Sequence, residues 1–223
     1  MTFFNRLVSE TDAARQEFVA IPVIGRALGG DVPLWLYRDF LAEAYHHVRH
    51  TCPLLALAAA RTTDAAYRNA LFSYIDEEKE HDEWILDDIG ALGGDAAEVK
   101  RRGGGIACRA MVAYAYWGIE HVSPYALLGM VHVLEGMSVE LATRAAASLQ
   151  KGLGVAGEAG FRYLRSHGTL DIEHTAFFRG LVNGIADPAA QAVIVDTANV
   201  MYRLYGNIFR ELDGRRREAG LAA

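Results

Sequence analysis

The stretch His167-Gly168-Thr169-Leu170-Asp171-Ile172-Glu173-His174 places two imidazoles and one carboxylate at offsets of 0, +4 and +7. In an α-helix, which turns by about 100° per residue, these three side chains fall within roughly 60° of arc on one face. Imidazole nitrogen and carboxylate oxygen are ligands that iron, manganese and zinc accept. The same spacing also suits a helix in which Asp171 caps or pairs with a neighbouring histidine. The stretch therefore predicts a metal-binding helix only if other helices supply further ligands.

The remaining sequence predicts an all-α protein with one domain over residues 1–223. The chain has 223 residues and is 52% hydrophobic, which is enough to bury a full core. Alternating β-branched patterns are nearly absent, and the five prolines stand mostly at expected element boundaries. Glycine, proline and polar clusters divide the chain into about seven helices, over residues 33–61, 62–92, 106–121, 124–151, 157–164, 169–183 and 188–212. We expect Pro53 to kink the first of these helices rather than end it.

Charge and cysteine usage exclude several classes of protein. The net charge is −6 and no predicted helix accumulates a basic face, so we expect no nucleic-acid partner. The two cysteines have no C-x-x-C spacing, which fits a reduced cytoplasmic compartment. The first residues show no signal-peptide pattern, and the apolar run at 53–60 is too short to span a bilayer. The sequence therefore predicts a cytoplasmic protein that acts on a small molecule.

Carboxylates accompany histidines more often than chance predicts. Six of the eight histidines have an Asp or Glu three or four positions away, whereas roughly three such pairings are expected by accident. The pairs lie on four predicted helices: Glu43 beside His46 and His47, Glu78 beside His81, His132 beside Glu135, and the 167–174 stretch. A helical bundle that offers carboxylates and imidazoles from four helices can hold two metal ions, whereas a single zinc needs only three or four ligands. The number of candidate ligands exceeds what one metal ion needs and therefore favours a dinuclear site.

Glu135 lies in an otherwise apolar predicted helix, so its carboxylate is expected to be partly buried. A buried carboxylate needs a partner, which here is either a metal ion or a hydrogen bond from a tyrosine. We expect His132, one turn earlier, to support the site or to pack in the core.

The order of these residues resembles the haem-oxygenase-like di-iron oxidases and oxygenases, which are relatives of the TenA and PqqC proteins. The H-x-x-x-D-x-x-H pattern at 167–174 carries most of the likeness, which covers about 32–212. The stretch 37–47 also resembles the TenA-type helix, which has an acidic residue where Glu43 stands. The resemblance implies a single-domain, seven-helix haem-oxygenase-like bundle. It also implies that the metal ligands are Glu43, Glu78, His81, Glu135, His167, Asp171 and His174.

The same resemblance implies a non-haem di-iron oxidase or oxygenase. Two Fe(II) ions, with manganese as an alternative, would activate O₂ to oxidise or cleave a small organic substrate. Such proteins hold iron weakly, and their last ligand helix can unwind without metal. Gly168 would lower the stability of that helix here. A homodimer is expected. An apolar substrate cavity is also expected, and its candidate aromatic lining is Tyr114, Trp117, Tyr125, Phe177 and Tyr205.

Several alternatives stay open on the sequence alone. Glu77 can replace Glu78 on the His81 face, and His47 or His50 can join the site. One competing function is a metal-free, TenA-like hydrolase of thiamin-type pyrimidines. Its nucleophile would be Cys108, near a helix start where the dipole lowers the pKa of a thiol, although the position favours a buried, inert cysteine over an activated one. Another is a non-enzymatic binding or regulatory protein. Haem binding is not expected. Haem oxygenases take the histidine that binds the haem iron from their first helix, and no histidine occurs in this sequence before His46.

Overall fold

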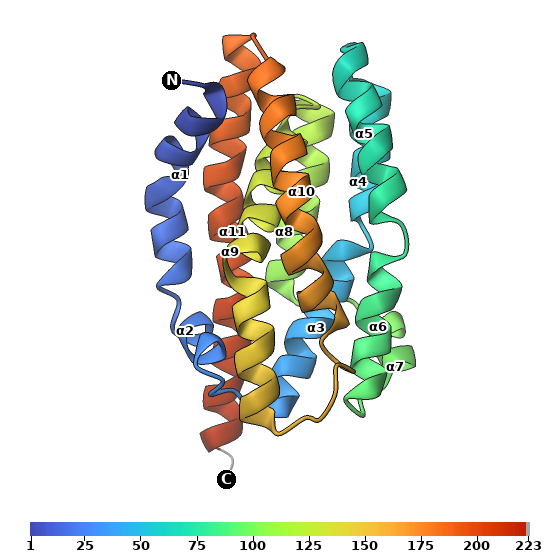
Figure 1. Ribbon diagram of the computed structural model, residues 1–223, viewed down its shortest axis with the longest axis vertical. Coiled ribbons are helices and arrows are strands. Elements are labelled where there is room, and N and C mark those ends of the chain that lie inside the picture. The colour runs from blue at the N-terminus through green and yellow to red at the C-terminus, as the bar shows by residue number, and fades with distance from the viewer. Residues whose placement is uncertain (222–223) are drawn as a thin grey trace.

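The computed structural model describes the backbone of residues 1–221 and the side chains of residues 1–166 and 175–215. These residues form eleven helices and no strand (Figure 1). In chain order the helices are α1 (Phe3–Val19), α2 (Pro22–Leu28), α3 (Leu34–Val48), α4 (Thr51–Arg61), α5 (Ala65–Glu78), α6 (His81–Ala91), α7 (Ala96–Arg101), α8 (Ile106–His121), α9 (Ala126–Leu153), α10 (Arg162–Gly184) and α11 (Pro188–Leu221). The predicted all-α class is confirmed.

The predicted number of seven helices is wrong. The prediction lacked α1, α2 and α7, it gave two helices where α10 is one, and breaks divide two of its other helices. The helix expected over 33–61 is α3 followed by α4, and the chain turns at Arg49 and His50. Pro53 lies in the first turn of α4, where a helix has no intrahelical acceptor for its N–H groups, so the missing N–H of proline does no harm. The expectation that Pro53 kinks one continuous helix is therefore also wrong.

The second break separates α5 from α6, inside the helix expected over 62–92. α5 ends at Glu78, α6 begins at His81, and Glu80 between them has φ of 68°. This left-handed conformation costs a residue with a Cβ about 1–2 kcal/mol. Strained backbone of this kind is found most often at functional sites. Here it lies between two of the predicted metal ligands.

The start of α10 is held by α6. The structure has one helix where the sequence predicted two shorter ones, at 157–164 and 169–183. The carboxylate of Asp88 on α6 accepts hydrogen bonds from the N–H groups of Arg162 (3.0 Å) and Tyr163 (2.8 Å). These are first-turn N–H groups that have no acceptor within their own helix. Asp88 thus joins the helix that begins with His81 to the helix that carries the 167–174 stretch.

Replacing Asp88 with alanine is expected to lower the free energy of unfolding by about 1–2 kcal/mol, because two N–H groups lose this acceptor. Chemical denaturation measures the change. Asp87→Ala is a matched control, because the Asp87 side chain is 74% exposed on the same helix. It should change the unfolding free energy by less than about 0.5 kcal/mol. Equal stability of the Asp88→Ala and Asp87→Ala proteins would contradict the capping role.

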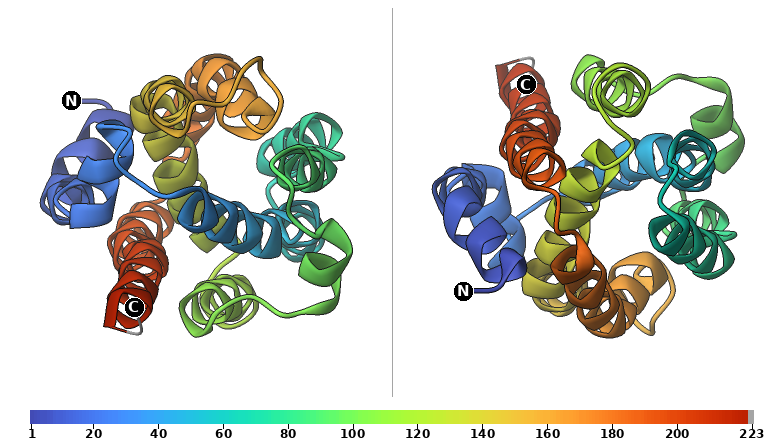
Figure 2. Two further views of the ribbon diagram at one scale, coloured as in Figure 1. Left: turned by 90° about the horizontal axis from the view of Figure 1, so that it is seen from below. Right: turned by 90° about the horizontal axis from the view of Figure 1, so that it is seen from above.

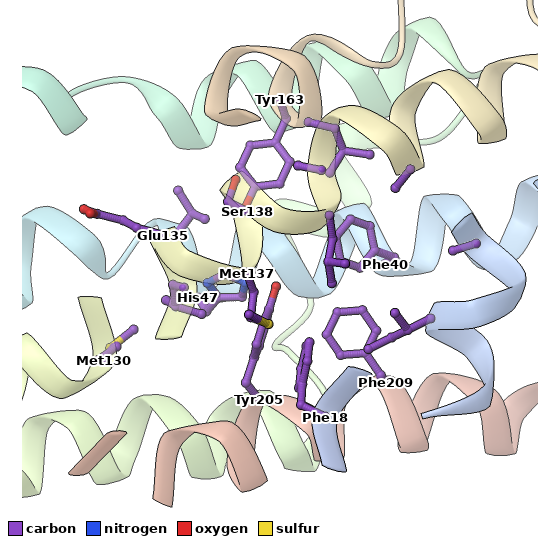
Figure 3. Close-up of a pocket in the computed structure, with 18 of the residues that line it drawn as sticks. Phe18, Phe40, His47, Met130, Glu135, Met137, Ser138, Tyr163, Tyr205 and Phe209 are labelled. Atoms are coloured by element: carbon purple, nitrogen blue, oxygen red, sulfur yellow. The ribbon is translucent and has the colours of Figure 1, made fainter. Parts of the chain in front are cut away.

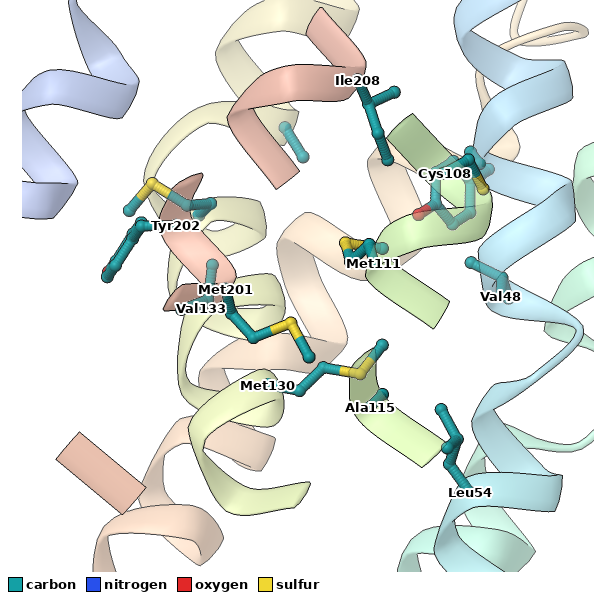
Figure 4. Close-up of a cluster of buried hydrophobic side chains, with 14 of the residues drawn as sticks. Val48, Leu54, Cys108, Met111, Ala115, Met130, Val133, Met201, Tyr202 and Ile208 are labelled. Atoms are coloured by element: carbon teal, nitrogen blue, oxygen red, sulfur yellow. The ribbon is translucent and has the colours of Figure 1, made fainter. Parts of the chain in front are cut away.

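α9 is the central helix of the bundle, and α10 and α11 pack along it (Figure 2). Its Met130 and Val133 face an apolar layer that includes Met111 of α8 and Met201 of α11 (Figure 4). Within the described residues, α9 alone has the length and composition of a membrane-crossing helix, and buried helices at the centre of folded bundles share that composition. This position makes α9 a wall of any cavity inside the bundle.

Candidate metal centre

Glu78 and His81 lie side by side across the break between α5 and α6. The Nδ1 atom of His81 is 3.1 Å from Oε2 of Glu78. Both side chains are buried, with exposed fractions of 3% for His81 and 10% for Glu78. The ring of Trp84 lies 4.1 Å from that of His81, centroid to centroid. The structure therefore brings these two predicted ligands together, although they belong to different helices.

The hydroxyl of Tyr74 on α5 lies close enough to Glu78 and to Glu135 of α9 to feel the charge of both. Burial raises the pKa of the Tyr74 hydroxyl well above its ordinary value. The charges of Glu135, Glu78 and Glu77, and a hydrogen bond to Glu135, act in the same direction. Tyr74 is therefore protonated at neutral pH and can donate to Glu135. Tyr74 is the tyrosine that fits the hydrogen-bond partner which the sequence left open for the Glu135 carboxylate.

Glu78 and Glu135 both line an apolar cavity of about 190 Å³ inside the bundle. Figure 3 shows Glu135 towards one end, with His47 of α3 and Tyr205 of α11 nearby, and Phe40 and Phe209 further along. Among the described residues that line the cavity, none is a lysine or an arginine. The cavity thus has carboxylates and an imidazole near one end and aliphatic or aromatic walls elsewhere.

Glu43 does not join Glu78 and Glu135. Its side chain is buried, but Oε2 accepts a hydrogen bond from the N–H of Gly105 (2.8 Å), and Oε1 accepts one from Arg215 of α11 (3.0 Å). Arg215 also binds Asp39 (3.2 Å) and Glu211 (3.0 Å). Glu43 therefore belongs to an ion-pair network between α3 and α11 and is not among the residues that line the cavity.

The other predicted ligands are His167, Asp171 and His174, and their side chains lie outside the described residues. The backbone of α10, which carries them, packs against α9 and α6, the helices of Glu135 and His81. Among the side chains that the structure describes, no group of three His, Cys, Asp or Glu residues could hold a metal ion. The assignment of His167, Asp171 and His174 stays a prediction.

The alternative ligands occupy different places. His47 lines the cavity, and its ring meets that of Tyr205 edge-on at 5.9 Å. The Nδ1 atom of His50 lies 3.0 Å from the Tyr116 hydroxyl, and His50 does not line the cavity. Glu77 lies close enough to Tyr74 for its charge to raise the pKa of that hydroxyl. Of these three alternatives, only His47 lines the same cavity as Glu78 and Glu135.

A model of the iron-containing redox enzyme family matches residues 38–206 of the chain. The chain belongs to this family. The match covers most of the chain and includes all seven predicted ligands, from Glu43 to His174. No curated protein matches the chain.

Solved structures confirm that the chain has a haem-oxygenase-like fold. A domain of unknown function from Shewanella denitrificans superposes with a TM-score of 0.88 at 19% identity, over 99% of this chain and 96% of that one. A TenA homologue from Pseudomonas syringae gives 0.78 at 12% identity, over 95% and 93%. A haem oxygenase from the cyanobacterium Synechocystis, in complex with haem, gives 0.77 at 16% identity, over 98% and 96%. The resemblance to haem-oxygenase-like and TenA proteins is confirmed, and these low identities show the fold alone.

Of the five aromatic residues expected to line the cavity of this redox enzyme, only Tyr205 does so. Trp117 and Phe177 are 50% and 41% exposed, and the Tyr125 hydroxyl donates to Asp64 (2.8 Å). The cavity aromatics that sequence reasoning missed are Phe18, Tyr37, Phe40, Tyr74, Tyr163 and Phe209. A signal was available for Tyr74, because it precedes Glu78 by four residues on the same helix.

Cys108 does not have the activated thiol that the hydrolase interpretation needs. Burial, together with the nearby charges of Glu43 and Glu211, raises the pKa of its thiol to about 12. Its Sγ lies 3.6 Å from the Glu43 carbonyl oxygen, in the buried layer of Figure 4. The structure agrees with the buried, inert cysteine, because burial raises the pKa of the Cys108 thiol by more than the helix start lowers it. Burial raises the pKa of Cys52, the other cysteine, as well.

His132 packs among aromatic rings one turn before Glu135. Its Nε2 lies 3.2 Å from the hydroxyl of Thr11, which itself donates to the Leu7 carbonyl (2.8 Å). Nε2 of His132 is therefore the donor to Thr11. The ring of Phe178 stacks 6.1 Å away. Burial lowers the pKa of His132 from 6.5 to about 4, so the imidazole is neutral at pH 7.

Stability should therefore fall as the pH drops from 7 to 4. His132 of the unfolded chain takes up a proton near pH 6.5, whereas in the folded protein it resists protonation until about pH 4. In this window the unfolded state binds more protons, so acidification favours unfolding, by on the order of 2 kcal/mol for this one group. Urea denaturation at pH 7 and at pH 4.5 measures the loss. His132→Phe should lose less stability over that interval, and an equal loss would contradict the assignment.

Proposed function

We propose that this iron-containing redox enzyme is a non-haem di-iron oxidase or oxygenase that uses O₂ to oxidise a small organic substrate. One observation carries the proposal. Glu78 of α5 and Glu135 of α9 come from separate helices, line the same apolar cavity and both act on the Tyr74 hydroxyl. Buried carboxylates that face one apolar space favour a bound cation, because a metal ion offsets the cost of burying negative charge.

The donor set fits iron. Glu78, His81 and Glu135 supply two carboxylates and one imidazole, and His167, Asp171 and His174 would add a third carboxylate and two imidazoles. Six such ligands from helices of one bundle suit two divalent ions. Glu43 is omitted from the proposed set, because both of its carboxylate oxygens accept hydrogen bonds elsewhere.

Iron, when bound, would supply the capacity to reduce O₂. The chain's own residues would control the surroundings of that reaction. Tyr74 would remain protonated and would orient the Glu135 carboxylate with its hydroxyl. The aliphatic and aromatic walls keep water away and position the substrate next to the two carboxylates. His47 and Tyr205 form the wall on the side of α3 and α11.

Anaerobic titration of the metal-free protein with Fe(II) tests the proposal. We expect about two iron ions per chain after removal of free metal. The loaded protein should then consume O₂ faster than the same amount of iron in buffer. Binding of no iron, or of a single ion that no titration raises to two, would overturn the di-iron assignment.

The TenA-like hydrolase predicts a different set of results. It needs no iron, and a thiamin-type pyrimidine would be hydrolysed without O₂. Cys108→Ser would abolish that hydrolysis, whereas His174→Ala would retain it. The raised pKa of both cysteine thiols is the structural reason for preferring the di-iron function.

A further inference from the structure

We propose that the cavity binds an unbranched, uncharged alkyl chain, with its functional end beside Glu78 and Glu135 and its tail directed towards α2. That the cavity is a substrate site rests on the proposed function. The recognition of an alkyl chain rests on the shape and chemistry of the walls, and it can be measured without iron.

The cavity follows one face of α9 over a long distance. Glu135, Ser138, Ala142, Ala145 and Leu149 all line it, at intervals of three or four residues, and α9 residues from Leu127 to Leu134 line it on the other side of Glu135. At about 1.5 Å per residue, the distance along the helix from Glu135 to Leu149 is about 21 Å. A space that extends along a helix in this way fits a linear molecule better than a compact ring.

The ionisable groups of the lining are His47, Glu78 and Glu135. Figure 3 shows the Glu135 carboxylate and the His47 imidazole towards one end of this space. Beyond Ser138, the wall formed by α9 is Leu141, Ala142, Ala145 and Leu149, and α2 adds an apolar wall through Val23, Ile24, Ala27 and Leu28.

The walls in the tail half of the cavity thus make favourable contacts with methylene groups and, in the part of the chain that the structure describes, have no group that would pair with an ion. No lysine or arginine is among the described lining residues, and the 167–174 stretch contains neither by sequence. A zwitterionic amino acid would lose its hydration there without a matching partner, whereas each buried methylene favours binding.

Small side chains keep this part of the cavity open. Ala27 of α2 and Ala142 and Ala145 of α9 all line the space. Larger aliphatic residues at these positions would fill it, and protein interiors are normally packed without such voids. Three alanines around one elongated space therefore indicate room for a ligand.

Binding of primary alcohols to the iron-free protein tests the inference. A neutral fluorescent probe, N-phenyl-1-naphthylamine, would be displaced by butanol, hexanol, octanol, decanol and dodecanol. Affinity should rise about fourfold per methylene and stop rising within this series, when the tail reaches α2. Decanoate should bind more weakly than decanol, because no lysine or arginine among the described lining residues would pair with its charge. Leucine should not displace the probe.

Two variants of α9 locate the tail. Ala145→Phe narrows the tail half of the cavity. It should weaken the binding of decanol by about tenfold while changing the affinity for hexanol by less than about twofold. Ala147→Phe is the matched control, because Ala147 is exposed on the same helix. It should leave the whole series unchanged. Failure of every alcohol to displace the probe, decanoate binding as tightly as decanol, or equal effects of both variants would overturn the inference.

These outcomes are distinguishable from a failure of the proposed function. Alcohol binding with the expected chain-length dependence in a protein that binds no iron would uphold the alkyl-chain site and overturn the di-iron enzyme. Binding of two irons by a protein from which no alcohol displaces the probe would uphold the di-iron site and overturn the alkyl-chain site.

Discussion

Glu135→Gln is expected to reduce the iron content of the anaerobically loaded protein from about two ions per chain to one or fewer. The amide has nearly the same shape as the carboxylate but lacks its negative charge and is a poorer ligand for iron. O₂ consumption should fall by about 100-fold or more, since even residues that only support a metal ligand change activity by 10- to 100-fold. Metal analysis and an oxygen electrode measure the two effects.

The control for Glu135→Gln is the same substitution at an exposed acidic residue. Glu83 on α6 is exposed and pairs with Lys100 (3.0 Å), and it does not line the cavity. Glu83→Gln should leave iron content and O₂ consumption unchanged. A Glu135→Gln protein that still holds two irons would show that Glu135 is not a ligand and that its role is the hydrogen bond with Tyr74.

Arg215→Ala is expected to lower the free energy of unfolding by about 2–3 kcal/mol. Glu43 is 3% exposed, and without Arg215 its carboxylate would keep only the Gly105 N–H among the partners described above. Removing one partner of a fully buried ion pair costs about 3–5 kcal/mol, and the 30% exposure of Arg215 reduces that figure here. Chemical denaturation of the metal-free protein measures the loss.

The Glu43→Gln substitution separates the structural role of this residue from the ligand role predicted by sequence. Combined with Arg215→Ala, it should recover part of the lost stability, because no buried charge is then left without its cation. Alone, it should leave the iron content at about two ions per chain. Loss of iron from Glu43→Gln, without a loss of stability, would restore Glu43 to the ligand set.

The fold class was predictable because helical periodicity and the order of acidic and histidine residues are local properties of the sequence. The 167–174 stretch was recognisable for the same reason. The breaks at Arg49–His50 and at Glu80 were not, because tertiary packing selects them against good helix-forming residues. The partner of Glu43 could not be predicted either, since Arg215 is 172 residues away and meets it only in the folded protein.

The candidate site was predictable in part. Glu78 and His81 were recognised as neighbours from their spacing, and the structure places them 3.1 Å apart. Tyr74 was missed, although it lies one turn before Glu78. The activation considered for Cys108 rested on its place near a helix start, which the sequence shows. The burial that reverses the effect depends on how α3 and α8 pack.

The left-handed residue Glu80 should be visible in amide hydrogen exchange. Because α6 starts anew at His81, its first turn lies outside the hydrogen-bond ladder that a continuous helix over 65–91 would provide, and the Glu83 N–H donates instead to the Glu80 carbonyl (3.1 Å). Protection should therefore be high within α5, drop over a short window just after Glu80, and rise again within α6. The E-x-x-H spacing, which on sequence alone suggests one rigid helix, would thus coincide with a local minimum of backbone protection between two of the proposed ligands.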